Sequence, residues 1–176
     1  LRDGWDLTDT RLYTVPLQGG PATPLSMPVS GGGALSPDGT QAVYSPLTRD
    51  FRTWKRYEGG WAQDLFVFDF KTSKLEPVSP SKRTERDPMW IGNRIWFVSD
   101  RDGTLNLYSY DLASKKTEQH TDEKVWDVRW ASRGEDGEIV YELDGELVVF
   151  DTNTSQSRKL DIRVPDDGVS SRPARV

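Results

Sequence analysis

The sequence contains no cysteine and only one histidine, His120. The lack of cysteine excludes disulfides, thiolate nucleophiles and cysteine-ligated zinc sites. A single histidine leaves one candidate base for serine chemistry, which needs a base within hydrogen-bond reach of the nucleophile. Apolar runs are short, and none approaches the roughly 20 residues of a membrane-spanning helix. We therefore predict no cofactor, no metal site and no membrane partner.

Basic residues are in the minority, with 23 Lys and Arg against 28 Asp and Glu and a net charge of −5. This balance argues against nucleic-acid binding, which needs a basic surface. Aromatic residues are abundant, with seven Trp, six Tyr and six Phe. They favour a packed β-sheet protein over a disordered chain. No signal-peptide pattern follows Leu1, and our working hypothesis is a cytoplasmic location.

One short pattern, an apolar strand followed by a turn, recurs along the chain. Its copies are LFVFD at 65–69, LYSYD at 107–111 and LVVFD at 147–151, with a related LYTVP at 12–16. The leading leucines of the first three lie 42 and 40 residues apart. A second strand follows each copy, and two more precede it in three of the four units. Four strands in about 40 residues are typical of a β-propeller blade, whereas a β-sandwich does not repeat one unit.

The repeat predicts an all-β chain of about three and a half blades, each of four antiparallel strands. The expected units are 1–28 (the outer strands of a partial blade), 29–80 (a blade with an insertion at 48–60), 81–122, 123–164, and a C-terminal tail at 165–176. Arg2-Asp3-Gly4 resembles Arg101-Asp102-Gly103, so we expect the chain to start after the second strand of its first blade. An incomplete propeller leaves open strand edges, which invite pairing. We therefore expect association with another copy or with the remaining domains of a parent protein.

Four segments resemble the propeller of tricorn-type serine peptidases of the S41 family: DFRTWKRYEGGW at 50–61, RDPMWIG at 86–92, SDRDGTLNLY at 99–108 and VPDDG at 164–168. The first is the most distinctive, because related forms of the others occur across TolB-like propellers. The resemblance implies a part of the N-terminal six-bladed propeller of a large, oligomeric, multidomain peptidase. In that family the propellers are thought to gate or channel peptides. The catalytic Ser and His lie in other domains, so no catalytic residue is implied here.

The residues themselves also predict a chain without catalysis. His120 occupies the repeat position of Leu25, Val78 and Leu160, which favours a packing role. There is no Gly-x-Ser-x-Gly nucleophile elbow. Carboxylates follow the repeat spacing rather than the paired arrangement of a glycosidase.

Two acidic features have a structural interpretation and a functional one. Asp100-Arg101-Asp102-Gly103 suggests a calcium loop, but it lacks the further ligands and the distal Glu, so a tight hairpin turn is favoured. The recurrent Asp69, Asp111 and Asp151 are interpreted as turn residues at strand ends.

The insertion at 48–60 is the strongest candidate for a binding function. The later blades need 11 and 8 residues between equivalent strand starts, whereas this one needs 24. Positive charge beside aromatic rings suits recognition of a peptide, a carboxylate or a partner surface. The candidate site residues are Arg49, Arg52, Trp54, Arg56, Tyr57 and Arg86. The alternatives are that the aromatic rings pack the loop onto its own blade or a neighbouring domain, and that Arg86 forms ion pairs between blades.

Two functions remain in competition. The first is a non-catalytic propeller portion of a tricorn-like peptidase that guides peptides. The second is a TolB-like protein-interaction propeller unrelated to proteolysis. A propeller lyase or glycosidase is disfavoured by the single histidine and the absence of a metal-ligand cluster in the sequence.

Overall fold

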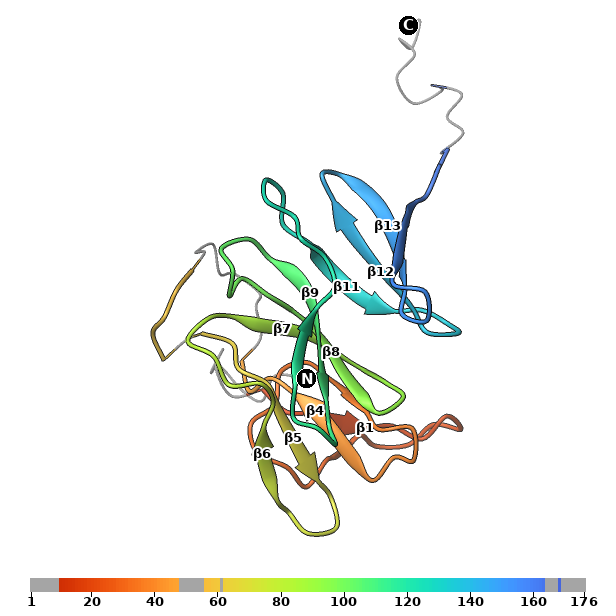
Figure 1. Ribbon diagram of the computed structural model, residues 1–176. Helices are drawn as coiled ribbons and strands as arrows, with labels where there is room; N and C mark the ends of the chain where they lie inside the picture. Colours follow the sequence, from red (N-terminus) through yellow and green to blue (C-terminus); the bar gives the residue numbers. More distant parts are fainter. Residues whose placement is uncertain (1–9, 48–55, 61, 164–167, 169–176) are drawn as a thin grey trace, which may run out of the picture.

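The computed structural model describes residues 10–47, 56–60, 62–163 and 168. All regular secondary structure in these ranges is β-strand, in four antiparallel sheets (Figure 1). This confirms the predicted all-β fold of repeated antiparallel units. Among the described residues, none belongs to a helix long and apolar enough to cross a membrane.

The sheets are built from strands that are consecutive in the sequence. A two-stranded sheet contains β1 (Tyr13–Thr14) and β2 (Thr23–Pro24). The first four-stranded sheet contains β3 (Gly33–Leu35), β4 (Gln41–Tyr44), β5 (Phe66–Asp69) and β6 (Leu75–Pro77). The second contains β7 (Glu85–Ile91), β8 (Arg94–Ser99), β9 (Asn106–Asp111) and β10 (Thr117–Gln119). The third contains β11 (Arg129–Arg133), β12 (Glu138–Leu143), β13 (Glu146–Asp151) and β14 (Gln156–Lys159).

The recurrent aspartates end the third strand of each four-stranded sheet and shape the turn that follows. Asp69 Oδ1 accepts the backbone N–H of Thr72 at 2.7 Å, and Asp111 Oδ1 accepts that of Ser114 at the same distance. Asp151 Oδ1 accepts the N–H of Asn153 at 2.8 Å. Hydrogen bonds of this kind hold the backbone in a turn. The backbone and side chain of Thr72 lower the pKa of Asp69 to about 2. These contacts agree with the turn interpretation.

The faces of neighbouring sheets bury three apolar clusters. Met27, Ala42, Tyr44 and Phe68 lie between the two-stranded sheet and β3–β6. Val43, Leu65, Trp90 and Phe97 belong to the cluster between β3–β6 and β7–β10. Trp96, Leu107, Tyr141 and Phe150 belong to the cluster between β7–β10 and β11–β14. Each large apolar side chain buried in this way contributes about 1.5–3 kcal/mol, so the alternating strand pattern determines how the sheets stack.

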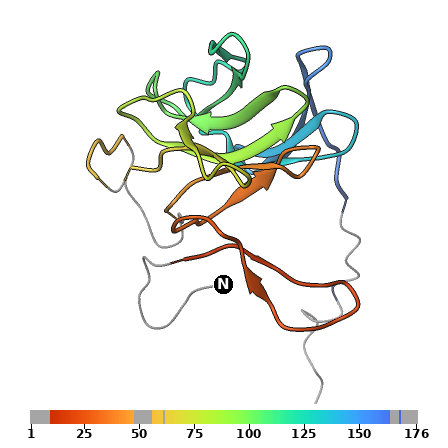
Figure 2. The same cartoon turned by 90° about the horizontal axis from the view of Figure 1, so that it is seen from below.

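The sheets follow one another in space in sequence order (Figures 1 and 2). β7 contacts both β3 and β11. A register shift between Arg86 and Met89 in β7 recurs between Arg129 and Ser132 in β11. Asp87 and Trp130, which follow the two arginines, both have positive φ angles, of 52° and 55°. The first strand of the third four-stranded sheet, β11, thus repeats the bulge of β7.

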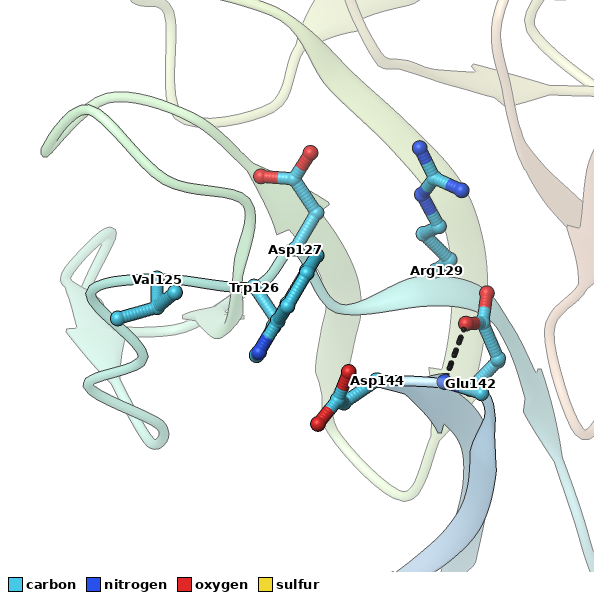
Figure 3. A pocket seen from close by; sticks show the side chains of 7 residues that line it. Val125, Trp126, Asp127, Arg129, Glu142 and Asp144 are labelled. Atoms are coloured by element: carbon cyan, nitrogen blue, oxygen red, sulfur yellow. Dashed lines mark hydrogen bonds between the residues drawn. The ribbon is translucent and has the colours of Figure 1, made fainter.

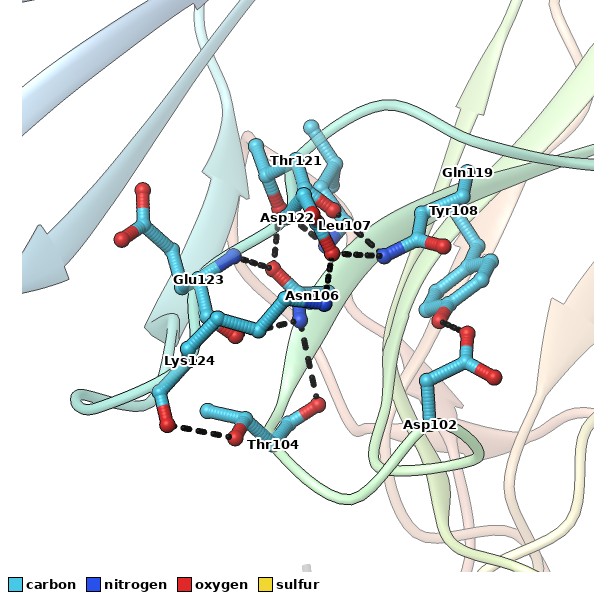
Figure 4. Close-up of polar contacts among 10 residues, drawn as sticks. All are labelled: Asp102, Thr104, Asn106, Leu107, Tyr108, Gln119, Thr121, Asp122, Glu123 and Lys124. Atoms are coloured by element: carbon cyan, nitrogen blue, oxygen red, sulfur yellow. Dashed lines mark hydrogen bonds and ion pairs between the residues drawn. The ribbon is translucent and has the colours of Figure 1, made fainter.

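The connection from β10 to β11 is held by one buried amide (Figure 4). Asn106 Oδ1 accepts the Thr121 hydroxyl at 2.8 Å and the backbone N–H of Glu123 at 2.7 Å. Its Nδ2 donates to the carbonyl oxygens of Glu123 (3.1 Å) and Thr104 (3.3 Å). Asn106 provides hydrogen-bond partners for the backbone of the β10–β11 connection where this connection leaves the second four-stranded sheet. In this way it positions the next sheet.

Candidate functional site

Arg56 is the first described residue after the segment 48–55. Its backbone has a positive φ of 54°. Its Nε donates to the carbonyl oxygen of Gly103 at 2.9 Å, in the turn between β8 and β9. The guanidinium is therefore directed at the following sheet, although the residue remains largely exposed. Arg56 links two sheets, and only part of its donor capacity remains for a ligand.

Tyr57 is half-buried and lies over a glycine two residues further on. A methyl group at Gly59 would overlap the Tyr57 ring and displace it. This contact lies within the insertion itself. Three other candidate residues, Arg49, Arg52 and Trp54, lie outside the described residues.

Arg86 lies inside β7 and is only 2% exposed. Its Nε is 3.3 Å from Asp87 Oδ2, and its guanidinium carbon is 6.0 Å from the centre of the Trp130 ring on β11. Within the described part of the chain, its Nε and Nη2 have no hydrogen-bond partner. Arg86 therefore lies between two sheets, next to the wall of the cavity described below.

A cavity of about 360 Å³ is lined by the first strands of the three four-stranded sheets. The lining residues are Gly32, Gly33, Ala34, Ser45, Asp87, Pro88, Met89, Ala131, Ser132 and Arg133. Ala34 pairs with Val43, Met89 with Trp96 and Ser132 with Val140. These partners occupy the same position in the three copies of the repeat, so each sheet contributes equivalent residues. In a propeller the first strands surround the central axis, which is where this cavity lies.

His120 is packed between the second and third four-stranded sheets. Its ring centre is 4.3 Å from that of Trp96 and 5.7 Å from that of Phe150. Burial lowers the pKa of His120, while Glu118 opposes this effect. His120 Nε2 lies 2.8 Å from Ser109 Oγ, a Ser–His contact that the sequence pattern did not indicate. Because Ser109 is fully buried and accepts a hydrogen bond from Arg94, this pair is not arranged for attack on a substrate.

The carboxylates considered for calcium are directed at protein donors. Asp102 accepts the Tyr108 hydroxyl, and Asp100 accepts backbone N–H groups. Gly103 has a φ of 104° and donates its N–H to the Asp100 carbonyl, which closes the turn. Among the described residues, no group of three or more His, Asp or Glu side chains is placed to hold a metal ion.

A second cavity, of about 260 Å³, lies on the third four-stranded sheet (Figure 3). Val125, Trp126, Asp127, Arg129, Glu142, Asp144 and Gly145 line it. Arg129 pairs with Glu142 as Arg86 pairs with Val98, so the two arginines are equivalent in the repeat. Arg86 is buried by Trp130 of the following sheet, whereas Arg129 is exposed. This cavity therefore lies on the face of the third four-stranded sheet. The equivalent face of the second four-stranded sheet is covered by the sheet that follows it.

Leucines at one repeat position show the same difference in burial. Leu65 and Leu107 are 1% and 0% exposed beneath the sheets that follow them. Leu147, at the same position in the third four-stranded sheet, is 39% exposed. Val125 and Trp126 add exposed apolar area on this sheet. The face resembles an interior surface of the propeller.

Comparison with known proteins identifies the family. The family model described as the tricorn protease N-terminal β-propeller domain matches residues 2–156. Tricorn protease homolog 1 of Streptomyces coelicolor is 33% identical over 152 residues, which are 85% of this chain and 14% of that protein. Tricorn protease of Thermoplasma acidophilum is 27% identical over 92% of this chain and 14% of its own length. The chain thus spans about one seventh of the length of these relatives.

Solved structures agree on the fold. The crystal structure of the tricorn protease superimposes with a TM-score of 0.75 and 24% identity, over 91% of this chain and 16% of that one. TolB from Acinetobacter baumannii gives a TM-score of 0.65 with 17% identity, over 85% of this chain and 37% of that one. Three stacked four-stranded sheets, the axial cavity and the family match lead to one conclusion. This chain belongs to the tricorn protease N-terminal β-propeller domain family.

Proposed function

We propose that this chain is a non-catalytic propeller portion of a tricorn-like serine peptidase, and that it guides peptides along its central axis and mediates interactions. The observation that carries this proposal is the axial cavity, to which each four-stranded sheet contributes equivalent residues. Small residues, such as Gly33, Ala34 and Ala131, leave space in this cavity. Backbone groups and the charges of Asp87 and Arg133 give it polar contacts for an extended chain.

The insertion at 48–60 is the proposed recognition element. Its arginines and aromatic residues suit a peptide or its terminal carboxylate, because guanidinium groups bind carboxylates through paired hydrogen bonds. We assign recognition to Arg49, Arg52 and Trp54, with Arg56 and Tyr57 supporting the loop. Arg86 is buried, so it contributes charge beside the axial cavity rather than a direct contact.

A role without catalysis is supported by the environment of the single histidine. His120 is packed against two aromatic rings, and its hydroxyl partner Ser109 is buried. We expect the purified chain not to hydrolyse casein or peptides. Turnover that disappears in a variant of this chain alone would refute the non-catalytic role.

Peptide binding can be measured by fluorescence anisotropy with a fluorescein-labelled casein-derived peptide that has a free C-terminal carboxylate. The Arg49→Gln/Arg52→Gln variant should bind it at least about tenfold more weakly, because charge-assisted hydrogen bonds each contribute about 1.5–3 kcal/mol. The amidated form of the peptide should bind the wild-type chain more weakly. Arg158→Gln, which removes an exposed arginine that pairs with Glu138 on the third four-stranded sheet, is the control. Equal affinity in all variants would count against recognition by the insertion.

The alternative is a TolB-like interaction propeller unrelated to proteolysis. The exposed apolar face of β11–β14 favours it, because such faces mark protein-interaction surfaces. The flanking coding sequence separates the two functions. A PDZ-like domain and a catalytic serine domain downstream would support the peptidase, and their absence would support the interaction module. In either case the partner is another copy of the chain or the remaining domains of a parent protein.

A further inference from the structure

The described end of the insertion, residues 56–60, lies against the following sheet. The insertion leaves the first four-stranded sheet after β4 and returns to it at β5. Between these points, Arg56 contacts Gly103 in the β8–β9 turn. The contacts described next show that Arg56 belongs to a larger attachment between the two sheets.

Asp100 is the central residue of this attachment, and it is only 5% exposed. Its Oδ2 accepts the backbone N–H of Arg56 at 3.0 Å. Its Oδ1 accepts the backbone N–H of Thr84, just before β7, also at 3.0 Å. One carboxylate thus joins the insertion to two segments of the neighbouring sheet. Hydrogen bonds to an ionised acceptor are about twice as strong as neutral ones.

Arg83 holds the same segment from the other side. Its Nη1 donates to the carbonyl oxygen of Arg56 at 3.0 Å, and its Nη2 lies 3.0 Å from Glu58 Oε1. Both polar backbone groups of Arg56 are therefore bonded to the second four-stranded sheet. A backbone held at both its N–H and its carbonyl has little freedom to move.

The base of the insertion is attached to the same two sheets. Gln63 Nε2 donates to the carbonyl oxygen of Leu47, which joins the two ends of the loop at 2.9 Å. The carbonyl oxygen of Gln63 accepts the N–H of Glu85, the first residue of β7, at 2.6 Å. The described part of the insertion is therefore bonded to the second four-stranded sheet both at Arg56 and at its base.

We propose that Asp100 is a positioning residue, through which the second four-stranded sheet fixes residues 56–60 of the insertion. The inference deepens the proposed function and rests on it for the role of the loop. The motif SDRDG thus has a function beyond closing a hairpin. The turn between β8 and β9 spans residues 100–105, whereas the equivalent turn of the third four-stranded sheet, between β12 and β13, is only Asp144-Gly145. The longer β8–β9 turn therefore belongs to the sheet that the insertion contacts.

The test is hydrogen exchange of the backbone amides at 56–60 in the 176-residue chain. Asp100→Ala removes the acceptor of both the Arg56 N–H and the Thr84 N–H. The Arg56 amide should therefore exchange at least about tenfold faster. Asp102→Ala is the matched control, since Asp102 lies in the same turn but bonds to the Tyr108 hydroxyl. It should leave exchange at 56–60 unchanged.

Arg83→Met provides a second, surface substitution in case Asp100→Ala does not fold. It removes the contacts to Arg56 and Glu58 and should also accelerate exchange at 56–60. Circular dichroism establishes that each variant retains its strands. Wild-type exchange rates in either folded variant would overturn the positioning role.

Peptide binding separates this inference from the proposed function. Faster exchange together with weaker binding of the carboxylate peptide supports both. Faster exchange with unchanged binding supports the positioning of the loop by Asp100 and counts against peptide recognition by the loop. Unchanged exchange overturns the positioning role whatever the peptide does.

Discussion

Arg101 Nη2 donates a 2.7 Å hydrogen bond to Glu85 Oε1, which joins the β8–β9 turn to the first residue of β7. The guanidinium also contacts Ser79 and Ser99 and lies 4.8 Å from the centre of the Tyr108 ring. Glu85 is fully buried. Arg101 therefore links the β8–β9 turn both to β7 and to Ser79, in the connection between β6 and β7.

The Glu85 carboxyl makes stability depend on pH. Burial raises the pKa of Glu85 to about 8, and Arg101 opposes this rise only in part. The folded state therefore binds this proton more tightly than the unfolded state does. The resulting stabilisation is present below about pH 4.5 and is lost as the pH rises towards 8. Glu85→Gln should remove a slope of at most about 1.4 kcal/mol per pH unit, measured by urea unfolding across this range. A wild-type slope retained in the variant would contradict this assignment.

Asn106 should be among the most sensitive polar positions. Asn106→Ala removes three hydrogen bonds to the β10–β11 connection and one to the Thr104 carbonyl, and it leaves partly buried backbone groups without these partners. We expect a loss of about 2–4 kcal/mol in the free energy of unfolding, measured by urea denaturation. Asn153→Ala is the control, because that side chain bonds to the Asp136 carbonyl at an exposed turn. A similar loss in both variants would argue against the role of Asn106.

His120→Leu should be tolerated, because other copies of the repeat have Leu or Val at this position. The variant keeps contacts to Trp96 and Phe150, and Ser109 retains its bond from Arg94. We expect a change within about 1 kcal/mol near pH 7. Since burial lowers the pKa of His120, protonation favours unfolding, and the wild type should lose stability relative to the variant below about pH 6.5. Thermal unfolding at several pH values measures this, and a large loss at pH 7 would contradict the packing role.

Leu147→Gln should weaken association of the chain. Leu147 lies on the open face of β11–β14, whereas its equivalents Leu65 and Leu107 are buried by a following sheet. Removing apolar area should shift the species seen by light scattering at micromolar concentration towards monomer. Leu107→Gln, in contrast, should destabilise the fold itself. A wild-type chain that is strictly monomeric would refute the expected association.

The repeat in the sequence was sufficient to predict the blades. The strand ending in Asp69, Asp111 or Asp151 recurs with turn residues behind it, and alternating apolar residues place one face of each sheet against the next. These signals are local, because a strand and its turn are encoded by adjacent residues. The register of the first strand of each sheet was harder to predict from the sequence than the strands and turns just described. A bulge between Arg129 and Ser132 interrupts the alternation of side chains in β11, and the same shift occurs between Arg86 and Met89 in β7.

The candidate site depended more on tertiary structure. The sequence by itself determined an all-β repeat, a long insertion rich in arginine and aromatic residues, and a single histidine at a packing position. Only the packing of sheets decided that Arg86 is buried beside Trp130, that Arg56 is bonded to Gly103, and that Asp100 holds the insertion. These contacts join residues up to 47 positions apart. No local pattern encodes them, because they arise where one sheet meets the next.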